Sequence, residues 1–399
     1  MSAASRTSTD HIVALLRAAP LIDGHTDLPW EIRGSRAKGE GEPDVSEAVP
    51  RLQTDLPRLA AGGVGGQFWS VYVPSDLPPV EAVTATLEQI DLVHELVRRH
   101  PDRLETARTA ADVERIAATG RVASMIGVEG GHSIGNSLGT LRALARLGAG
   151  YLTLTHNDDT AWADAATGDH PHGGLTRFGE EVVRELNRCG VLVDLSHVSD
   201  HTMRQAIEVS EAPVVFSHSS ARALCDVTRN VPDDVLETVA RTGGVVMVTF
   251  VPSFVAAAGA EANRAGWAEA RRLREEHPDD PGVVGAAMDV WFAALGEVPA
   301  TVGEVADHVD HIRDVAGIEH IGIGSDFDGA PSMPAGLEDV SRFPALFAEL
   351  AERGYTDEDL LKIAGRNVLR VMREAERVAE RLQAARPPSN ATMDALDAG

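Results

Sequence analysis

Histidine and carboxylate residues follow several short apolar segments of this sequence, and such side chains could bind metal ions. The first of these segments ends in His25-Thr26-Asp27. Later segments are followed by Glu129, His156, His197, His218 and Asp326. Imidazole nitrogens and carboxylate oxygens, without thiolates, suit zinc or another divalent transition metal. The pattern therefore predicts a metal centre built from residues that lie far apart in the chain.

Each of these residues also has a simpler interpretation. A lone histidine after a strand is more often a capping or core residue, and Glu129, which precedes two glycines, could be a turn residue. Asp326 or Asp328 could cap a following helix. The joint pattern favours a metal site, because six of the eight predicted strands end in a residue type that binds metals. Six unrelated occurrences of such residues, all at the same end of the strands, would be much less probable than a single metal site that uses them together.

The apolar segments are short, bounded by glycine, proline or aspartate, and mostly rich in valine, isoleucine or aromatic residues, which is typical of strands. The predicted strands are Leu21–Gly24, Gly65–Val73, Val122–Val128, Gly150–Thr155, Val191–Leu195, Pro213–Ser217, Gly244–Phe250 and His320–Gly324. Helical periodicity predicts helices over Val80–Arg99, Leu138–Leu147, Phe178–Arg188, Thr202–Val209, Asp233–Arg241 and Val302–Val315, and, after the last strand, over Leu337–Glu352 and Asp357–Leu382.

Eight strands, each followed by helix, predict a (β/α)8 TIM barrel, whose active site forms at the C-terminal ends of the strands. A doubly wound open sheet is the alternative, but it usually has fewer strands and often a glycine-rich phosphate loop, which this sequence lacks. The 399 residues then form one barrel over residues 1–383. Residues 251–300 form an insertion after the seventh strand, and residues 384–399, with Pro387-Pro388, form a loose tail.

Composition excludes several classes of function. The net charge of -25 repels phosphate backbones, so we expect no nucleic-acid partner. Two cysteines, Cys189 and Cys225, rule out a disulfide framework and a cysteine-rich zinc module. The polar N-terminus does not resemble a secretory signal, and no apolar stretch is long enough to cross a membrane. The sequence therefore predicts a cytoplasmic protein.

The scarcity of lysine limits how two metals could be bridged. Two metals about 3.5–4 Å apart need a bridging anionic ligand besides hydroxide, and some barrel hydrolases use a carboxylated lysine. The only lysines are Lys38, in a predicted loop, and Lys362, in a late predicted helix, so neither ends a strand. Any bridge from the protein must then be a carboxylate, and Glu129 is the natural choice.

Seven segments together resemble the membrane (renal-type) dipeptidases, which are peptidase family M19 of the amidohydrolase superfamily. They are His25-Thr26-Asp27, Gly127–Gly130, Leu154–Asn157, Val193–Ser199, Pro213–Ala221, Arg229–Asp234 and Gly324–Gly329. The matches occur in order between about residue 20 and residue 370.

The resemblance implies a centre with two zinc ions per chain. His25 and Asp27 would hold one zinc, His197 and His218 the other, and Glu129 would bridge both. His156 would bind the substrate carbonyl oxygen and stabilise the oxyanion, and Arg229 would bind the C-terminal carboxylate of a dipeptide. Asp326 would be the acid/base for attack by a metal-bridging hydroxide. The family tends to form dimers, so a homodimer is also implied.

The resemblance implies a zinc-dependent dipeptidase that accepts a D-residue at the C-terminal position. Other amidohydrolase reactions stay open, such as N-acyl-amino-acid deacylation and lactam or lactone hydrolysis, as does a metal-dependent ligand-binding barrel. The mammalian members are secreted, disulfide-bonded and lipid-anchored, whereas this sequence has no apolar C-terminal tail, so no membrane anchor is expected. Substrate preference depends on the loops after the second and seventh predicted strands, the latter being segment 251–300. Trp69, Tyr72 and Phe254 are pocket candidates, although aromatic residues at such positions are more often core residues.

Overall fold

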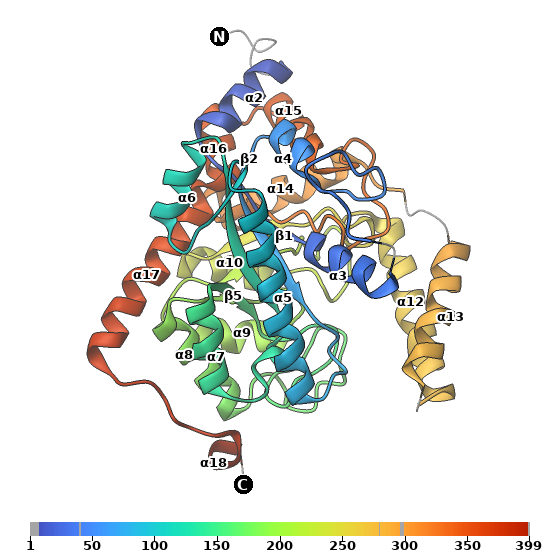
Figure 1. Ribbon diagram of the computed structural model, residues 1–399, viewed down its shortest axis with the longest axis vertical. Coiled ribbons are helices and arrows are strands. Elements are labelled where there is room, and N and C mark those ends of the chain that lie inside the picture. Colours follow the sequence, from blue (N-terminus) through green and yellow to red (C-terminus); the bar gives the residue numbers. More distant parts are fainter. Residues whose placement is uncertain (1–7, 40, 279, 296–298, 398–399) are drawn as a thin grey trace.

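A closed ring of parallel strands forms the centre of the computed structural model, which describes residues 8–39, 41–278, 280–295 and 299–397, and helices surround this ring (Figure 1). The eight strands are β1 (Leu21–Thr26), β2 (Val64–Tyr72), β4 (Val122–Glu129), β5 (Ala149–Thr153), β6 (Leu192–Asp194), β7 (Val215–Phe216), β8 (Val245–Val248) and β9 (Ile321–Ile323). The ring closes because β2 pairs with both β1 and β4, while β1 also pairs with β9. The predicted (β/α)8 barrel is confirmed.

Two short strands differ from the prediction. A ninth strand, β3 (Leu104–Thr106), pairs with the first half of β4, and β5 takes over the same edge from Ile126 onward. Three residues with one buried side chain carry too little pattern to be recognised in the sequence. Strand β7 ends before Ser217, because the Ser217 N–H donates to the Asp194 carboxylate at 2.8 Å.

Burial of the ring explains its composition. Every residue of β1, β4 and β6 to β9 is buried. Parallel strands covered by helices on the outside and filled by side chains on the inside have no solvent-facing side, so their sequences are almost continuously apolar. Except for His25, which lies within β1, the candidate metal ligands lie at the strand ends or just beyond them, and this transition made the site visible in the sequence.

Most helices lie where the periodicity predicted them. They are α5 (Pro79–Arg99), α7 (Leu138–Leu147), α8 (Arg177–Cys189), α9 (Asp200–Val209), α10 (Asp233–Thr242) and α14 (Val302–Ala316). Four helices that precede β4 were not predicted, namely α2 (Thr9–Ala18), α3 (Leu28–Lys38), α4 (Leu56–Gly62) and α6 (Ala110–Ala117). Helix α4 and helix α6 are short, and α3 contains Pro29 and Gly34, which weaken a helical pattern. Lys38 therefore ends a helix rather than lying in a loop.

The helices after β9 are more divided than predicted. The expected helix from Leu337 begins only at Phe343, as α15 (Phe343–Glu352), because residues 340–342 form a 3-10 turn capped by the Asp339 side chain. The expected helix over Asp357–Leu382 consists of α16 (Asp357–Leu361), a π-helix (Lys362–Arg366) and α17 (Asn367–Ala385). Lys362 lies in this π-helix and forms an ion pair with Glu319 at 2.9 Å.

Three helices follow β8 within segment 251–300. They are α11 (Pro252–Val255), α12 (Ala257–Glu276) and α13 (Pro281–Leu295). Helices α12 and α13 pack against each other and stand to one side of the barrel (Figure 1). No helix in the described part of the chain is both long and apolar enough to cross a membrane.

The C-terminal segment contacts the barrel, unlike the loose tail that its two prolines suggested. Helix α18 (Met393–Asp397) lies against α8, where the Phe178 N–H donates to Asp397 Oδ1 at 3.2 Å. Met393 and Leu396 pack on the core, and the Ser389 carbonyl accepts a hydrogen bond from Arg142 at 2.7 Å.

Candidate metal centre

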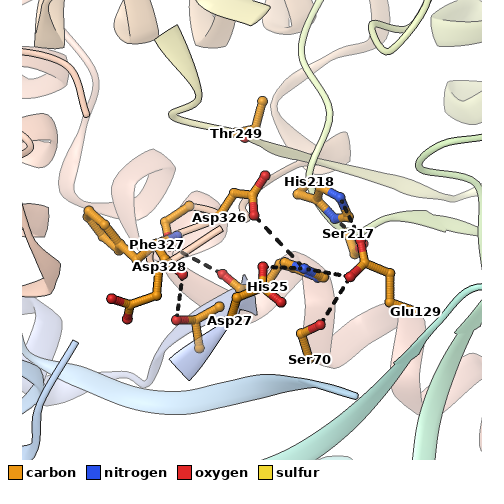
Figure 2. A network of polar contacts seen from close by, with 12 residues as sticks. His25, Asp27, Ser70, Glu129, Ser217, His218, Thr249, Asp326, Phe327 and Asp328 are labelled. Atoms are coloured by element: carbon orange, nitrogen blue, oxygen red, sulfur yellow. Dashed lines mark hydrogen bonds and ion pairs between the residues drawn. The ribbon is translucent and has the colours of Figure 1, made fainter. Parts of the chain in front are cut away.

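All eight predicted site residues lie at the C-terminal ends of the strands, which is one rim of the barrel. His25 lies in β1, Asp27 directly follows it, and Glu129 ends β4. His156, His197, His218 and Asp326 lie two or three residues beyond β5, β6, β7 and β9, and Arg229 lies in the loop after β7. Figure 2 shows His25, Glu129 and His218 directed toward one another. The folded chain therefore brings together residues as far apart in sequence as His25 and Asp326.

The Glu129 carboxylate lies between two sets of potential ligand atoms. Its Oε2 is 3.5 Å from His25 Nε2, which is 3.4 Å from Asp27 Oδ2. Its Oε1 is 3.1 Å from His197 Nε2 and 3.5 Å from His218 Nε2. The two oxygens thus face separate pairs of residues, which is the arrangement that a bridging ligand requires. The Ser70 hydroxyl donates to Oε2 at 3.1 Å and helps to hold the carboxylate (Figure 2).

Hydrogen bonds behind the histidines direct their Nε2 atoms into the centre. His25 Nδ1 lies 2.8 Å from the Tyr151 hydroxyl, which donates its own proton to a backbone carbonyl of β1. His218 Nδ1 lies 2.8 Å from Ser217 Oγ, whose proton goes to the Asp194 carboxylate at 2.7 Å. Since both hydroxyl protons are used elsewhere, each Nδ1 is the donor and each Nε2 faces Glu129. Outer hydrogen bonds of this kind commonly orient histidines that bind metals.

The arrangement fits divalent metal ions. His197 Nε2 and His218 Nε2 are only 2.9 Å apart, and among the described residues His25 Nε2 and Asp27 Oδ1 are buried without a hydrogen-bond partner. Buried polar atoms are costly unless they are paired or coordinate a metal. Ligand atoms of three groups lie within 4.8 Å of one another: His25, Glu129 and His218; Glu129, His156 and His197; and His25, Asp27 and Asp326. Nitrogen and carboxylate donors are those that zinc prefers in the absence of thiolates.

Burial and neighbouring charges set the protonation of these groups. Burial, with the positive charge of Arg229 and of neighbouring histidines, holds the pKa values of His197 and His218 well below the usual range. Both rings are therefore neutral at neutral pH and can offer a lone pair. Burial acts to raise the pKa of Glu129, but His25 and His197 hold that pKa well below its usual range. Glu129 is therefore an anion that can offset the charge of two cations.

Asp326 lies beside this group with an unusual backbone. Its φ is 65°, in the left-handed region, and its N–H donates to the His25 carbonyl at 3.1 Å. His197 and Asp328 have φ values of 67° and 65°. Asp326 Oδ1 is 4.0 Å from His25 Nε2, and burial raises the pKa of Asp326 to about 7. A carboxyl group with such a pKa can both accept and return a proton near neutral pH.

Arg229 lies inside the molecule rather than in a surface salt bridge. It is 2% exposed, lines the same cavity as Glu129, and its guanidinium lies 5.2 Å from the centre of the Phe254 ring. Its hydrogen bonds to the His218 carbonyl and Ser219 Oγ are long, at 3.3 Å and 3.5 Å, and its Nε has no partner among the described residues. A buried guanidinium with donors to spare is suited to bind an anionic group of a ligand.

His156 lies at the edge of the centre. Its Nε2 is 3.8 Å from Glu129 Oε1, and its ring lies 4.4 Å from that of His197 and 4.8 Å from that of Tyr72. Burial lowers the pKa of His156, which favours the neutral ring. A neutral imidazole with one N–H at this position can donate to a ligand oxygen, which agrees with the substrate-binding role predicted for it.

A cavity of about 640 Å³ opens above these residues. Of the predicted pocket residues, Tyr72 and Phe254 line it, whereas Trp69 is fully buried in the core. Lining residues that the sequence did not reveal include Trp30, Glu31, Arg51, Gln53 and Trp267. They come from helices and loops around the rim, where no apolar periodicity indicates which side chains point inward. Asp328, noted in the sequence only as a possible cap, also lines the cavity.

Comparison with known proteins agrees with this geometry. The sequence model of the membrane dipeptidases (peptidase family M19) matches residues 9–386. The structure resembles the probable dipeptidase PvdM from Pseudomonas aeruginosa, with a TM-score of 0.81 and 26% identity over 93% of this chain and 99% of that chain. It also resembles a metallo peptidase from Rhodobacter sphaeroides liganded with a phosphinate mimic of the dipeptide L-Ala-D-Ala, with a TM-score of 0.74 and 26% identity over 90% of this chain and 99% of that chain. A third similar structure is the metallo peptidase called dipeptidase AC, of family M19, with a TM-score of 0.74 and 27% identity over 90% of this chain and 98% of that chain. The chain therefore belongs to the membrane dipeptidases, peptidase family M19.

Proposed function

We propose that this protein is a zinc-dependent dipeptidase that hydrolyses dipeptides, including those of the L-Xaa-D-Xaa type. The observation that carries the proposal is the Glu129 carboxylate, whose two oxygens face separate pairs of metal-ligand residues in the cavity that Arg229 lines. A relative that was solved with a mimic of L-Ala-D-Ala supports the choice of stereochemistry.

Two zinc ions fit the donor set. In this proposal His25, Asp27 and Glu129 hold one ion, and His197, His218 and Glu129 hold the other. When bound, two such ions polarise a substrate carbonyl and lower the pKa of a water molecule in the site. Neither lysine lines the cavity, so the bridging charge comes from Glu129.

Arg229 binds and orients the substrate. Its unused guanidinium donors bind the C-terminal carboxylate of the dipeptide, and the Phe254 ring against the guanidinium keeps it in place. Because Arg229 is buried beside the centre, the bound carboxylate holds the adjacent peptide bond close to Asp326 and Glu129. This contact selects the peptide bond next to the C-terminal residue, which is the single peptide bond of a dipeptide.

Asp326 and His156 act on the peptide bond itself. Asp326 takes a proton from the attacking water and returns it to the leaving nitrogen, which suits a carboxyl group whose pKa is raised to about 7 by burial. His156 donates a hydrogen bond to the carbonyl oxygen as negative charge develops there. Asp326 follows β9 and His156 follows β5, and these strands lie on opposite sides of the ring, so the two residues can reach the peptide group from different sides.

The experiment is an assay of the purified, zinc-loaded protein on L-Ala-L-Ala and L-Ala-D-Ala, with release of free alanine as the readout. We expect turnover of both, with about two zinc ions per chain by elemental analysis. Asp326→Asn should retain the metal but lose most of the activity. If protein that carries two zinc ions releases no alanine from any dipeptide, the proposal is refuted.

Parallel assays separate the alternatives. N-acetyl-D-alanine tests for a deacylase, and a β-lactam and a lactone test for ring-opening hydrolysis. Faster turnover of N-acetyl-D-alanine than of either dipeptide would assign the site to deacylation. Ligand binding that is unchanged in Asp326→Asn, with no product formed, would indicate a binding protein.

A further inference from the structure

The cavity above the metal centre has opposite charges on its two sides. Arg229, with Phe254, lines the side formed after β7 and β8, whereas three carboxylates, those of Asp27, Glu31 and Asp328, line the side formed after β1 and β9. The negative charges that act most strongly to raise the pKa of Asp328 are those of Glu31 and Asp27. The negative charges that act most strongly to raise the pKa of Arg229 are those of Asp326, Glu129 and Asp194. Asp326 lies close to Asp27, since a Cβ atom at Gly329 would lie 2.3 Å from Asp326 Oδ1 and 2.4 Å from Asp27 Oδ2, and the Arg229 charge acts to lower the pKa of Asp326.

Asp328 is held firmly, and the Thr54 side chain also acts to lower its pKa, but one of its oxygens has no hydrogen bond of ordinary length among the described residues. Its Oδ1 accepts a hydrogen bond from the Gln53 N–H at 2.6 Å, and its own N–H donates to Gln53 Oε1 at 2.7 Å. Its Oδ2 is buried without a hydrogen-bond partner among the described residues, although the residue lines the cavity. A buried carboxylate oxygen without a donor is unfavourable, so this position favours a ligand that brings N–H groups and positive charge.

Glu31 adds negative charge to the same side. It lies in the first turn of α3, with its side chain 39% exposed, and its nearest cation is Arg51, at 3.6 Å. Arg51 also donates to Ser35 Oγ at 2.8 Å, so its guanidinium is shared. An exposed ion pair of this length is weak. Since Asp27 is a proposed zinc ligand, the carboxylates left on this side are those of Glu31 and Asp328, and the single shared guanidinium does not cancel both.

We propose that Asp328, with Glu31, forms a binding site for a primary ammonium group and that this site binds the free amino terminus of the substrate. This inference rests on the proposed dipeptidase function. A dipeptide whose carboxylate binds Arg229 and whose peptide bond lies beside Asp326 extends its α-ammonium group toward Asp328. The site then selects dipeptides with a free amino terminus over N-acylated amino acids and over lactams that lack an amine.

The test compares two phosphinate mimics of L-Ala-D-Ala that differ only in the presence of the amino group. Inhibition constants are measured for the zinc-loaded wild type, Asp328→Asn and Glu31→Gln. The asparagine keeps the oxygen that accepts from Gln53 and removes the charge. The matched control is Glu88→Gln, since Glu88 is an exposed residue of α5 that pairs with Arg33 and does not line the cavity.

In the wild type and in Glu88→Gln, the mimic with the amine should bind at least about tenfold more tightly, the effect of one charged hydrogen bond. In Asp328→Asn this advantage should fall below about threefold, with unchanged binding of the amine-free mimic. Glu31→Gln should reduce the advantage to a smaller extent. The inference is overturned if the mimic with the amine still binds at least about tenfold more tightly in both Asp328→Asn and Glu31→Gln. It is also overturned if Asp328→Asn binds both mimics more weakly by the same factor.

Two outcomes distinguish this inference from the proposed function. If the wild type hydrolyses dipeptides but binds both mimics equally, the ammonium site is wrong and the dipeptidase proposal stands. If the wild type hydrolyses no dipeptide, the dipeptidase proposal fails. Circular dichroism checks that Asp328→Asn is folded, and if it is not, the same comparison with Glu31→Gln decides.

Discussion

Gly329 allows two carboxylates of the site to approach the backbone closely, and its replacement by alanine tests whether their positions matter. A Cβ atom at this position would lie 2.3 Å from Asp326 Oδ1 and 2.4 Å from Asp27 Oδ2. Ordinary contacts between carbon and oxygen are about 3.3 Å or longer. In Gly329→Ala both carboxylate oxygens must therefore move by about 1 Å, or the loop must shift by a similar amount.

The expected loss of catalytic rate follows from this displacement of the two carboxylates. A shift of about 1 Å in a group that acts on the substrate costs on the order of 100-fold in rate. We therefore expect kcat for L-Ala-D-Ala to fall about 100-fold. Because Asp27 is a proposed ligand, zinc content should also fall. The melting temperature should change little, since Gly329 lies at the open cavity rather than in the core.

The control is Gly34→Ala in α3, where an added Cβ meets no atom within 4 Å. This variant should keep full activity and gain slightly in stability, since alanine is favoured over glycine by roughly 0.5–1 kcal/mol inside a helix. Steady-state kinetics and elemental analysis on both variants make the comparison. If Gly329→Ala keeps kcat within about threefold of the wild type, an effect far below the 100-fold estimate, the carboxylate positions are not critical and the reasoning fails.

Three further predictions concern the metal, the substrate and stability. Glu129→Gln keeps the side-chain volume and the oxygen that accepts from Ser70, but it removes the negative charge. Bound zinc should therefore drop from about two ions per chain to less than one, as measured by elemental analysis. Retention of two ions would contradict the bridging role. Arg229→Ala should raise KM for dipeptides about 10- to 100-fold, the value of one or two charged hydrogen bonds, and an unchanged KM would place the carboxylate elsewhere. His308 is buried between the Ala221 N–H and the Val255 carbonyl, and burial lowers its pKa to about 4. Because the unfolded chain takes up a proton near pH 6.5 and the folded chain does not, His308 lowers the free energy of unfolding by about 2 kcal/mol between pH 7 and pH 5. Urea titrations at both pH values should show this loss in the wild type, and His308→Gln should show correspondingly less.

The barrel and the clustering of the candidate metal ligands could be predicted because both depend on one regular feature. A parallel strand in a barrel is buried along its length, so its end appears in the sequence as a change from apolar to polar residues. His197 and His218 are 21 positions apart in the chain, yet their Nε2 atoms lie 2.9 Å apart because each follows a neighbouring strand. The strand ends were sufficient to find them.

Residues inside the strands and around the rim could not be predicted in this way. Tyr151 lies within a strand and looks like a core residue, and only the folded structure shows its hydroxyl beside His25. Trp69 and Tyr72 are three positions apart in β2, so their side chains lie on opposite faces, and only Tyr72 reaches the cavity. Trp267 comes from α12, and no periodic pattern shows which face of that helix is turned toward the site.

The left-handed backbone at His197, Asp326 and Asp328 has a consequence for protein engineering. Residues other than glycine lose roughly 1–2 kcal/mol in this conformation, so glycine at any of the three positions would relieve local strain. A library selected only for resistance to heat would therefore favour replacements at the positions on which the proposed chemistry depends. Thermostable variants of this enzyme should be sought with these three positions held constant, because selection for heat resistance and selection for turnover act on them in opposite directions.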